Sequence, residues 1–422
     1  MSAFLHASRS RTLPSYLVFA AFGAFWGVWG ASIPRIREQA GVDDAQLGVA
    51  LLFIGGGALP AMLLTGSVVD RWGRRTTALM LIALGVCGVG VALTAHGLIA
   101  LCAGLALLGA SSGATDVAMN SMAGDAEQAT GRPVLTRAAG AFSVLVVVGS
   151  LGTGIAAQAG APTVMPFAIA AVLDGVIAVV VFAGSPAGLA ARPSDAAAAA
   201  RPAVAPLDRR LVAPLLIIGA LGTLAFASEN AHQSWQAVFF EQELGSGPGR
   251  SALAPAVFAA VVAVARLSLG AVPPRFAAHI LVLGATVAAA GAVVVSIAQS
   301  LPVAALGIVL AAAGTGGLFP TLLSVPARNV PEAYRGRSTA IISTVAYLGF
   351  LLGPVYVGFW ADGTSLRGAM VAVAALGAAL AVLAVPALRA SGFAIHGTRT
   401  IAPPADANET GPRDDVIARP GA

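Results

Sequence analysis

The stretch GSVVDRWGRR, residues 66–75, connects two apolar runs that are each long enough to cross a membrane. The run before it covers about 45–68 and the run after it covers about 77–96. A spanning helix needs about 20 mainly apolar residues, because it must match the hydrocarbon thickness of the bilayer. The stretch therefore predicts a short, charged turn between two transmembrane helices.

The same alternation of long apolar runs and short polar breaks continues along the whole chain. Of its 422 residues, 57% are apolar and 10% are charged, whereas a water-soluble domain carries roughly 25% charged residues. Further runs of spanning length lie at about 14–33, 98–122, 136–159, 163–186, 211–240, 252–271, 277–298, 302–326, 338–361 and 367–388. We therefore expect twelve transmembrane helices, of which the first is retained rather than cleaved as a signal peptide.

The twelve runs divide into two sets of six. Residues 188–210, between the sixth and seventh runs, are rich in Ala and Pro as in a cytoplasmic linker, and the polar residues 391–422 predict a disordered cytoplasmic tail. We expect an all-α membrane protein with two pseudo-symmetric six-helix bundles, 1–187 and 211–390. An internal repeat at an offset of 200 is indicated by two matching triplets, which are Arg137, Ser143 and Gly149 against Arg337, Ser343 and Gly349.

Arginine supplies all 24 basic residues, and its distribution predicts the orientation of the chain. If the N-terminus is cytoplasmic, the inside segments up to residue 390 hold 17 arginines, among them Arg266. The outside segments hold four, Arg35, Arg37, Arg250 and Arg367. Because basic residues are enriched on the cytoplasmic side, we expect a multi-pass protein of the cytoplasmic membrane with both termini inside. The arginines are scattered through short loops, so nucleic-acid binding is not expected.

Residues in the turn at 66–75 have distinct physical roles. Gly66 permits close helix contact, Gly73 permits a tight turn, and Asp70 can pair with an arginine or lie near a helix N-terminus. The pattern resembles G-x-x-x-D-R-x-G-R-R, the signature loop of the major facilitator superfamily (MFS), and matches it at Gly66, Asp70, Arg71, Gly73, Arg74 and Arg75. The resemblance implies a gating loop in which Asp70 meets the start of the eleventh helix and latches the cytoplasmic face.

Four further stretches resemble a bacterial branch of this superfamily whose members are mostly of unassigned substrate, with distant similarity to fucose permeases. They are GASSGATDVAMN from Gly109, ENAHQSW from Glu229, GLFPTLLS from Gly317 and GFLLGP from Gly349. The second-half counterpart of the signature loop, ARLSLGAVPPR from Ala265, lacks the Asp, so we expect an asymmetric gate. The fifth helix lacks the Gly-Pro of the antiporter signature, so that motif does not assign proton antiport.

Ionisable side chains inside the spans are functional candidates, because each costs about 2.5–3.5 kcal/mol on insertion scales. Glu229, His232 and Gln233 share a polar stripe of the seventh helix. The stripe indicates either a proton carrier beside a cavity or contact with water near the external mouth.

Two aspartates inside other spans have different interpretations. Asp116 lies four residues before Asn120 in the fourth helix, so the two share one face and indicate either solute or proton binding or a gating contact with nearby arginines. Asp174 lies near the middle of the sixth helix, which packs peripherally in the superfamily, and we expect it to be a locally hydrogen-bonded structural residue.

Aromatic side chains predict the wall of a central cavity. Phe22, Trp26 and Trp29 recur on one stripe of the first helix, and Trp235 and Tyr347 are candidates to join them. Such walls suit stacked sugars as well as amphiphilic or aromatic compounds. Interfacial packing is the alternative for each residue.

These features predict a secondary active transporter that works by alternating access and is coupled to protons. Efflux of drug-like or metabolic compounds and uptake of a sugar-like solute both fit. A non-transporting receptor on the same scaffold is the alternative. ATP hydrolysis is not expected, because the chain lacks the P-loop pattern, and an enzyme is not expected, because it lacks a metal motif such as H-E-x-x-H. We expect no cofactor and no metal site. The expected partners are a small solute, protons and the lipid bilayer, and the chain is expected to be a monomer.

Overall fold

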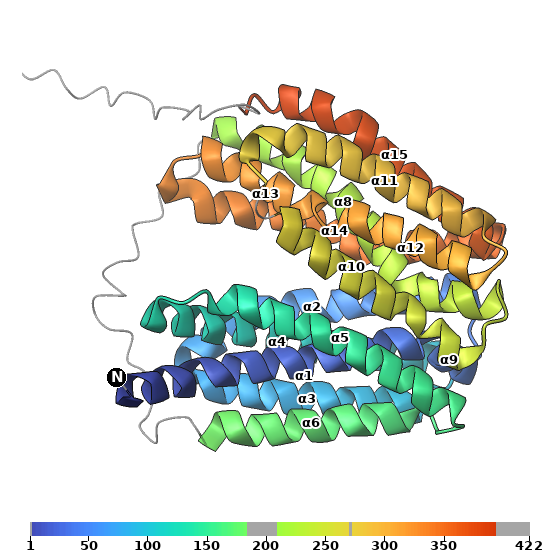
Figure 1. Ribbon diagram of the computed structural model, residues 1–422, viewed down its shortest axis with the longest axis horizontal. Coiled ribbons are helices and arrows are strands. Elements are labelled where there is room, and N and C mark those ends of the chain that lie inside the picture. The colour runs from blue at the N-terminus through green and yellow to red at the C-terminus, as the bar shows by residue number, and fades with distance from the viewer. Residues whose placement is uncertain (1, 184–208, 270–271, 394–422) are drawn as a thin grey trace, which may run out of the picture.

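The computed structural model describes residues 2–183, 209–269 and 272–393, which are almost entirely helical (Figure 1). Twelve segments of this described part are long and apolar enough to cross a membrane, as predicted. Most of the predicted linker and tail lies outside the described residues. Arg209 and Arg210, which the prediction places in the linker, already belong to a helix.

The two halves of the chain contain corresponding sets of helices. The first half contains α1 (Ser2–Ala40), α2 (Asp44–Trp72), α3 (Arg74–Thr94), α4 (Leu98–Thr130), α5 (Val134–Gln158) and α6 (Val164–Ala183). The second half contains α8 (Arg209–Gln242), α9 (Gly247–Ser251), α10 (Leu253–Leu269), η1 (Pro274–Phe276), α11 (Ala277–Ile297), α12 (Leu301–Thr315), α13 (Leu318–Asn329), α14 (Glu332–Gly363) and α15 (Leu366–Ala390). The eighth span combines α9 with α10, and the tenth span combines α12 with α13.

Local sequence signals explain where α2 begins and ends. Asp43 starts it with a capping box, accepting a hydrogen bond from the Gln46 backbone N–H at 2.7 Å while its own N–H donates to the Gln46 side chain at 3.2 Å. Gly73 is the single residue between α2 and α3, with φ 54° and ψ −132°. Only glycine adopts such a conformation at low cost, so the signature loop reverses the chain in one residue.

Glycines at equivalent positions bring equivalent helices into backbone contact. Gly149 of α5 lies directly against the backbone of Ala24 in α1, and Gly349 of α14 lies directly against the backbone of Thr223 in α8. Helices in a membrane associate through such close packing, because lipid provides no hydrophobic drive between them. The repeat predicted from these glycines therefore corresponds to the same helix crossing in both halves.

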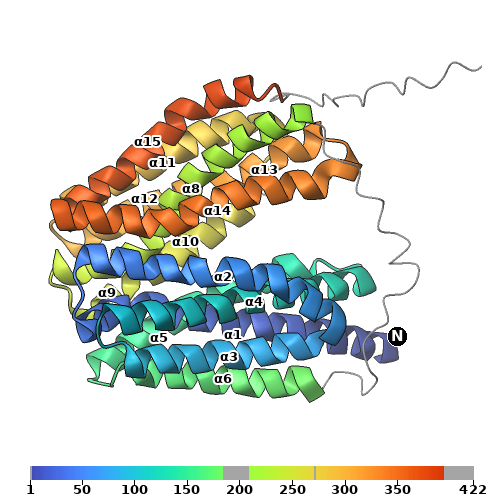
Figure 2. The same cartoon turned by 180° about the vertical axis from the view of Figure 1, so that it is seen from behind.

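The two halves meet at one end of the molecule and diverge toward the other (Figures 1 and 2). We call the end where α6 stops and α8 starts the linker end, and the opposite end the far end. At the far end Gly48 of α2 packs on Gly358 of α14, and the Ser150 hydroxyl of α5 donates to the Ala252 carbonyl at 2.8 Å. One buried apolar cluster joins both halves, whereas the buried cluster around Leu215 and Leu322 contains second-half residues only.

The tenth span is interrupted where its equivalent in the first half, α4, is continuous. α12 stops at Thr315 and α13 starts at Leu318. Pro320 has no backbone N–H, so it cannot donate to the carbonyl of Gly316 four residues earlier. The sequence GTGGLFP therefore weakens the helix and leaves one carbonyl in need of another donor.

Candidate functional site

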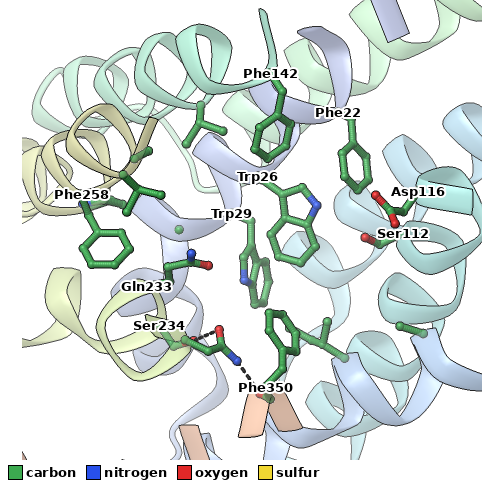
Figure 3. Close-up of a pocket in the computed structure, with 18 of the residues that line it drawn as sticks. Phe22, Trp26, Trp29, Ser112, Asp116, Phe142, Gln233, Ser234, Phe258 and Phe350 are labelled. Carbon is green, nitrogen blue, oxygen red and sulfur yellow. Dashed lines mark hydrogen bonds between the residues drawn. The ribbon is translucent and has the colours of Figure 1, made fainter. Parts of the chain in front are cut away.

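A cavity of about 340 Å³ lies between the two halves, near the middle of the spanning helices. The first half contributes α1, α2, α4 and α5 to its wall, and the second half contributes α8, α10 and α14. Figure 3 shows aromatic rings from both halves around it, with Asp116 and Ser112 on one side and Gln233 and Ser234 on another. The contacts at the far end close the cavity there, on the side opposite the linker end.

The cavity wall is mainly aromatic. Phe22, Trp26, Trp29 and Tyr347 line it, and Phe22 contacts Trp26 edge to face with ring centroids 6.2 Å apart. Trp235 does not line it, because its indole N–H donates to the Pro354 carbonyl at 3.2 Å inside the second half. Further aromatic residues that the sequence analysis did not select also line the cavity, namely Phe142, Phe226, Phe258 and Phe350.

Asp116 is the acidic residue of the first half on the cavity wall. The Asn120 side-chain amide donates to its carboxylate at 3.1 Å and to its backbone carbonyl at 2.8 Å. Tyr347 of the opposite half lines the same cavity. Within the described part of the chain, no ion pair joins Asp116 to Arg71 or Arg75.

Glu229 forms an ion pair with Arg266, with 2.8 Å between the carboxylate oxygen and the guanidinium nitrogen. The Glu229 side chain is 8% exposed and that of Arg266 is 46% exposed, so the carboxylate lies behind the arginine. Gln233, which lines the cavity, also donates to the Glu229 carboxylate at 3.2 Å. Glu229 is therefore buried in the protein rather than in contact with water at an external mouth.

Arg266 lies inside the membrane-spanning α10 and lines the cavity, which corrects its assignment to a cytoplasmic loop. Its Nε donates to the Gly316 carbonyl at 3.2 Å. This is the carbonyl that Pro320 leaves without a helical donor. Arg266 thus joins the acidic residue of α8 to the interruption between α12 and α13. A second cavity of about 220 Å³ lies on the other side of Arg266, against Gly317 and Thr321.

His232 and Gln236 lie away from the central cavity. The His232 ring is fully buried and stacks on Phe258, with ring centroids 5.9 Å apart. Its Nδ1 lies 2.9 Å from the Gln236 amide nitrogen. Of the predicted polar stripe, Gln233 therefore reaches the cavity, whereas His232 packs behind Phe258.

Asp174 is fully buried in α6, where it faces Gly85 of α3. Neither carboxyl oxygen has a hydrogen-bond partner among the described residues, so the prediction of a locally hydrogen-bonded side chain is wrong. The neighbouring positions on α3 and α6 are occupied by apolar or glycine residues, which cannot donate a side-chain hydrogen bond.

The predicted gating loop lies at the linker end, where α2 turns into α3. Asp70, Arg71 and Gly73 are exposed there. The Arg75 guanidinium stacks over the Phe182 ring at 5.5 Å, which attaches the start of α3 to the end of α6. Gly66 has open space around it, so it makes no close helix contact in this conformation.

Two polar residues of the site, Arg266 and Asn230, could have been found from prolines in the sequence. Pro354 leaves the Phe350 carbonyl without a helical donor, as Pro320 does for Gly316. The Asn230 amide donates to the Phe350 carbonyl and is held in turn by Ser234 (Figure 3). A proline in a spanning helix therefore predicts a side-chain donor on a neighbouring helix.

Gly109 to Gly113 also match the letters of the G-x-S-x-G pattern of serine hydrolases. That pattern requires a sharp strand-to-helix turn that exposes the serine. Here Ser111 lies within the continuous helix α4, is 7% exposed and donates to the Leu108 carbonyl at 2.9 Å. Among the described residues, no three His, Cys, Asp or Glu side chains gather as they would around a metal ion.

Comparison with known proteins agrees with this architecture. The family model described as Major Facilitator Superfamily matches residues 15–354 and 275–409. An uncharacterized MFS-type transporter of Yersinia pestis is 28% identical over 368 residues, which cover 87% of this chain and 93% of the relative.

Two solved structures share the fold over nearly their whole length. A bacterial homologue of the human lysosomal transporter Spinster, in an inward-facing and unoccupied conformation, has a TM-score of 0.71 at 16% identity, covering 91% of this chain and 98% of that one. The nucleoside transporter NupG has a TM-score of 0.70 at 14% identity, covering 90% and 99%. The chain therefore belongs to the Major Facilitator Superfamily of membrane transporters.

Proposed function

We propose that this protein is a secondary active transporter that moves a small organic solute across the cytoplasmic membrane, coupled to protons. The observation that carries this proposal is the cavity between the two halves, lined by both and closed at the far end. A solute bound there could leave past the far end only if the halves rock about it, which is alternating access.

The arginine distribution supports a cytoplasmic location for the linker end. In that orientation the conformation described here is open to the cytoplasm. Three of the four arginines at the opposite end are held by protein groups: Arg37 pairs with Asp44 at 2.8 Å, Arg367 pairs with Glu243 at 2.9 Å, and Arg35 donates to the Ala161 carbonyl. These arginines stabilise the far end rather than provide a basic surface.

Glu229 is the proposed proton carrier, because it is a buried carboxylate with one cationic partner. Proton binding would remove its negative charge and with it the attraction for Arg266, whereas the Arg266 bond to Gly316 would remain. The charged or titratable groups around Glu229 are Arg266 beside it, with Tyr347 and Asp116 across the cavity and His232 turned away. Protonation would therefore release α8 from the α12–α13 interruption.

The signature loop is the proposed latch of the opposite conformation. Rocking the halves together at the linker end would bring Asp70 toward the start of α14 and close the cytoplasmic mouth. The single-residue turn at Gly73 keeps the loop short enough for Asp70 to remain at the mouth.

Transport in inside-out membrane vesicles tests the proposal. A proton gradient is imposed and its dissipation is followed while sugars and cationic or aromatic amines are added. We expect solute-dependent proton movement in the unmodified protein and its loss in Glu229→Gln. Asp362→Asn, an exposed carboxylate at the end of α14, is the matched control and should behave like the unmodified protein. Solute movement without protons would overturn the coupling, and absence of any solute movement would overturn transport.

A further inference from the structure

We propose that the solute is an organic monocation with an aromatic or apolar body, and that its cationic group binds at Asp116. This inference rests on the proposed function and names the chemical class that the central cavity takes. It is carried by the charges on the cavity wall, by the partners of its polar groups, and by the position of the aromatic rings.

The charges on the wall favour a cation. Arg266 is the positive group there, and it is already bound by Glu229 at 2.8 Å and by the Gly316 carbonyl at 3.2 Å. An anionic solute would meet a guanidinium whose charge Glu229 already balances, so its net attraction to the wall would be small. Asp116 has no arginine partner among the described residues, only the Asn120 amide. With Glu229 ionised, the wall carries one unneutralised negative charge.

The amide groups of the wall do not provide a site for an anion either. Asn230 donates to the Phe350 carbonyl, and Gln233 donates to the Glu229 carboxylate at 3.2 Å. Polar groups beside Asp116, such as the Ser112 hydroxyl, can accept hydrogen bonds from an ammonium group. A cation at Asp116 would therefore gain a charge-assisted contact without breaking an existing hydrogen bond of the wall.

Aromatic rings surround the position where the cation would bind. Phe22, Trp26 and Trp29 of α1 line the same cavity as Asp116, and Figure 3 shows Phe22 and Asp116 on the same side of it. Cations are attracted to aromatic faces, most strongly to that of tryptophan. Further rings of the wall, Phe142, Phe226 and Phe258, suit the apolar body of the solute. The polar groups among them, Asn230, Gln233 and Ser234, already donate hydrogen bonds within the protein. A sugar would find these amide and hydroxyl donors already engaged, which disfavours it relative to an amine at Asp116.

The test is equilibrium dialysis of the full-length protein in lipid nanodiscs with three probes of one shape and different charge. Naphthylethylamine is the cation, naphthylethanol is the neutral probe and naphthylacetate is the anion, and binding to empty nanodiscs is subtracted. We expect the amine to bind most tightly. We expect Asp116→Asn to weaken amine binding by about 30-fold, as the loss of a charge-assisted contact does, and to leave naphthylethanol binding unchanged.

Two further variants keep the result interpretable. Asp116→Glu retains the charge and should retain the preference for the amine even if the affinity falls. Asp362→Asn removes an exposed carboxylate outside the cavity and should change nothing. The proposal would be overturned by a preference for naphthylacetate or naphthylethanol, by undetectable amine binding, or by an equal loss of all probes in Asp116→Asn. Such a result would contradict the solute class alone, because proton-coupled movement of another solute is measured separately in the vesicle assay.

Discussion

Asp116 and Asn120 occupy the same turn of α4 that Gly316 and Pro320 occupy in the second half, 200 residues later. In α4 the helix is continuous, and Asn120 donates to both the backbone and the side chain of Asp116. In the second half Pro320 has no N–H to donate, the helix is interrupted, and Arg266 supplies the missing hydrogen bond. Equivalent turns thus present a carboxylate to the cavity in one half and hold an arginine in the other.

In a symmetric protein both halves would place the same charged groups on the cavity wall, whereas here the first half has Asp116 and the second half has Arg266. In our proposal the first half offers the charge of Asp116 to a solute, whereas in the second half Glu229 and Arg266 pair with each other and Arg266 holds the interrupted helix. Arg266 itself stands 200 residues after Gly66, so one repeat has a glycine of α2 at this position and the other has an arginine that forms an ion pair. The predictions below test how far the two halves really differ.

The largest effect is expected from Arg266→Ala, which leaves the buried Glu229 without a cationic partner and the Gly316 carbonyl without a donor. The free energy of unfolding should fall by about 3 kcal/mol. A thiol-reactive dye that labels Cys87 and Cys102 as the protein unfolds measures this. The double variant Glu229→Gln with Arg266→Gln removes both charges and should recover most of the loss. A double variant less stable than Arg266→Ala would contradict the pairing.

A smaller effect, the same in both halves, is expected from Gly149→Ala and Gly349→Ala. Each added methyl group would meet the backbone of a neighbouring helix, Ala24 or Thr223. Each substitution should lower the free energy of unfolding by about 2 kcal/mol, as forced repacking does. Gly152→Ala, on the same helix as Gly149 but with open space around it, is the control. Clearly unequal losses for Gly149 and Gly349 would show that the two crossings are not equivalent.

Pro320→Ala should make the second half more like the first. It restores an N–H to the Gly316 carbonyl, so the free energy of unfolding should rise by about 1 kcal/mol. Transport should slow, because the Gly316 carbonyl of a continuous helix no longer needs the hydrogen bond from Arg266. Pro386→Ala, at an exposed proline in α15, serves as the comparison and should leave transport unchanged. Faster transport in Pro320→Ala would contradict a role for the interruption.

The smallest effect on stability is expected from Asp70→Asn in the signature loop. Asp70 is exposed, so the free energy of unfolding should change by less than about 0.5 kcal/mol. Transport should nevertheless fall by roughly tenfold, because the latch of the opposite conformation is weakened. The comparison is made at equal abundance of both proteins in the membrane. Unchanged transport in Asp70→Asn would remove the latch from the mechanism.

The features predicted correctly from the sequence are those that depend on local composition and on the repeat. Run length and apolar content determine each span, and the glycine spacing of 200 residues corresponds to the same helix crossing twice. The single-residue turn at Gly73 follows from glycine alone. The cavity residues on α1 were found because three aromatics recur on one helical stripe.

Other site residues could not be placed because their role depends on how a helix is rotated. Trp29 faces the cavity, whereas Trp235 packs on the Pro354 carbonyl, and nothing in the local sequence distinguishes them. Arg266 was assigned to a cytoplasmic loop because ARLSLGAVPPR corresponds to the signature loop of the first half. Its long side chain instead reaches Glu229 on another helix.

The most direct test of alternating access compares distances at the two ends of the molecule by pulsed electron paramagnetic resonance. Spin labels are attached at Ala129 and Ala327 for the linker end, and at Ala159 and Ser300 for the far end, after Cys87 and Cys102 are replaced by Ala. Gly358→Leu opposes far-end closure, since Gly358 packs directly on Gly48. Gly56→Leu, with open space around it, is the control.

We expect the linker-end distance to shorten and the far-end distance to lengthen in Gly358→Leu relative to the control. Reciprocal changes at the two ends are what rocking about a central cavity requires. If the far end opens while the linker-end distance stays the same, or if both distances change in the same direction, the account is contradicted.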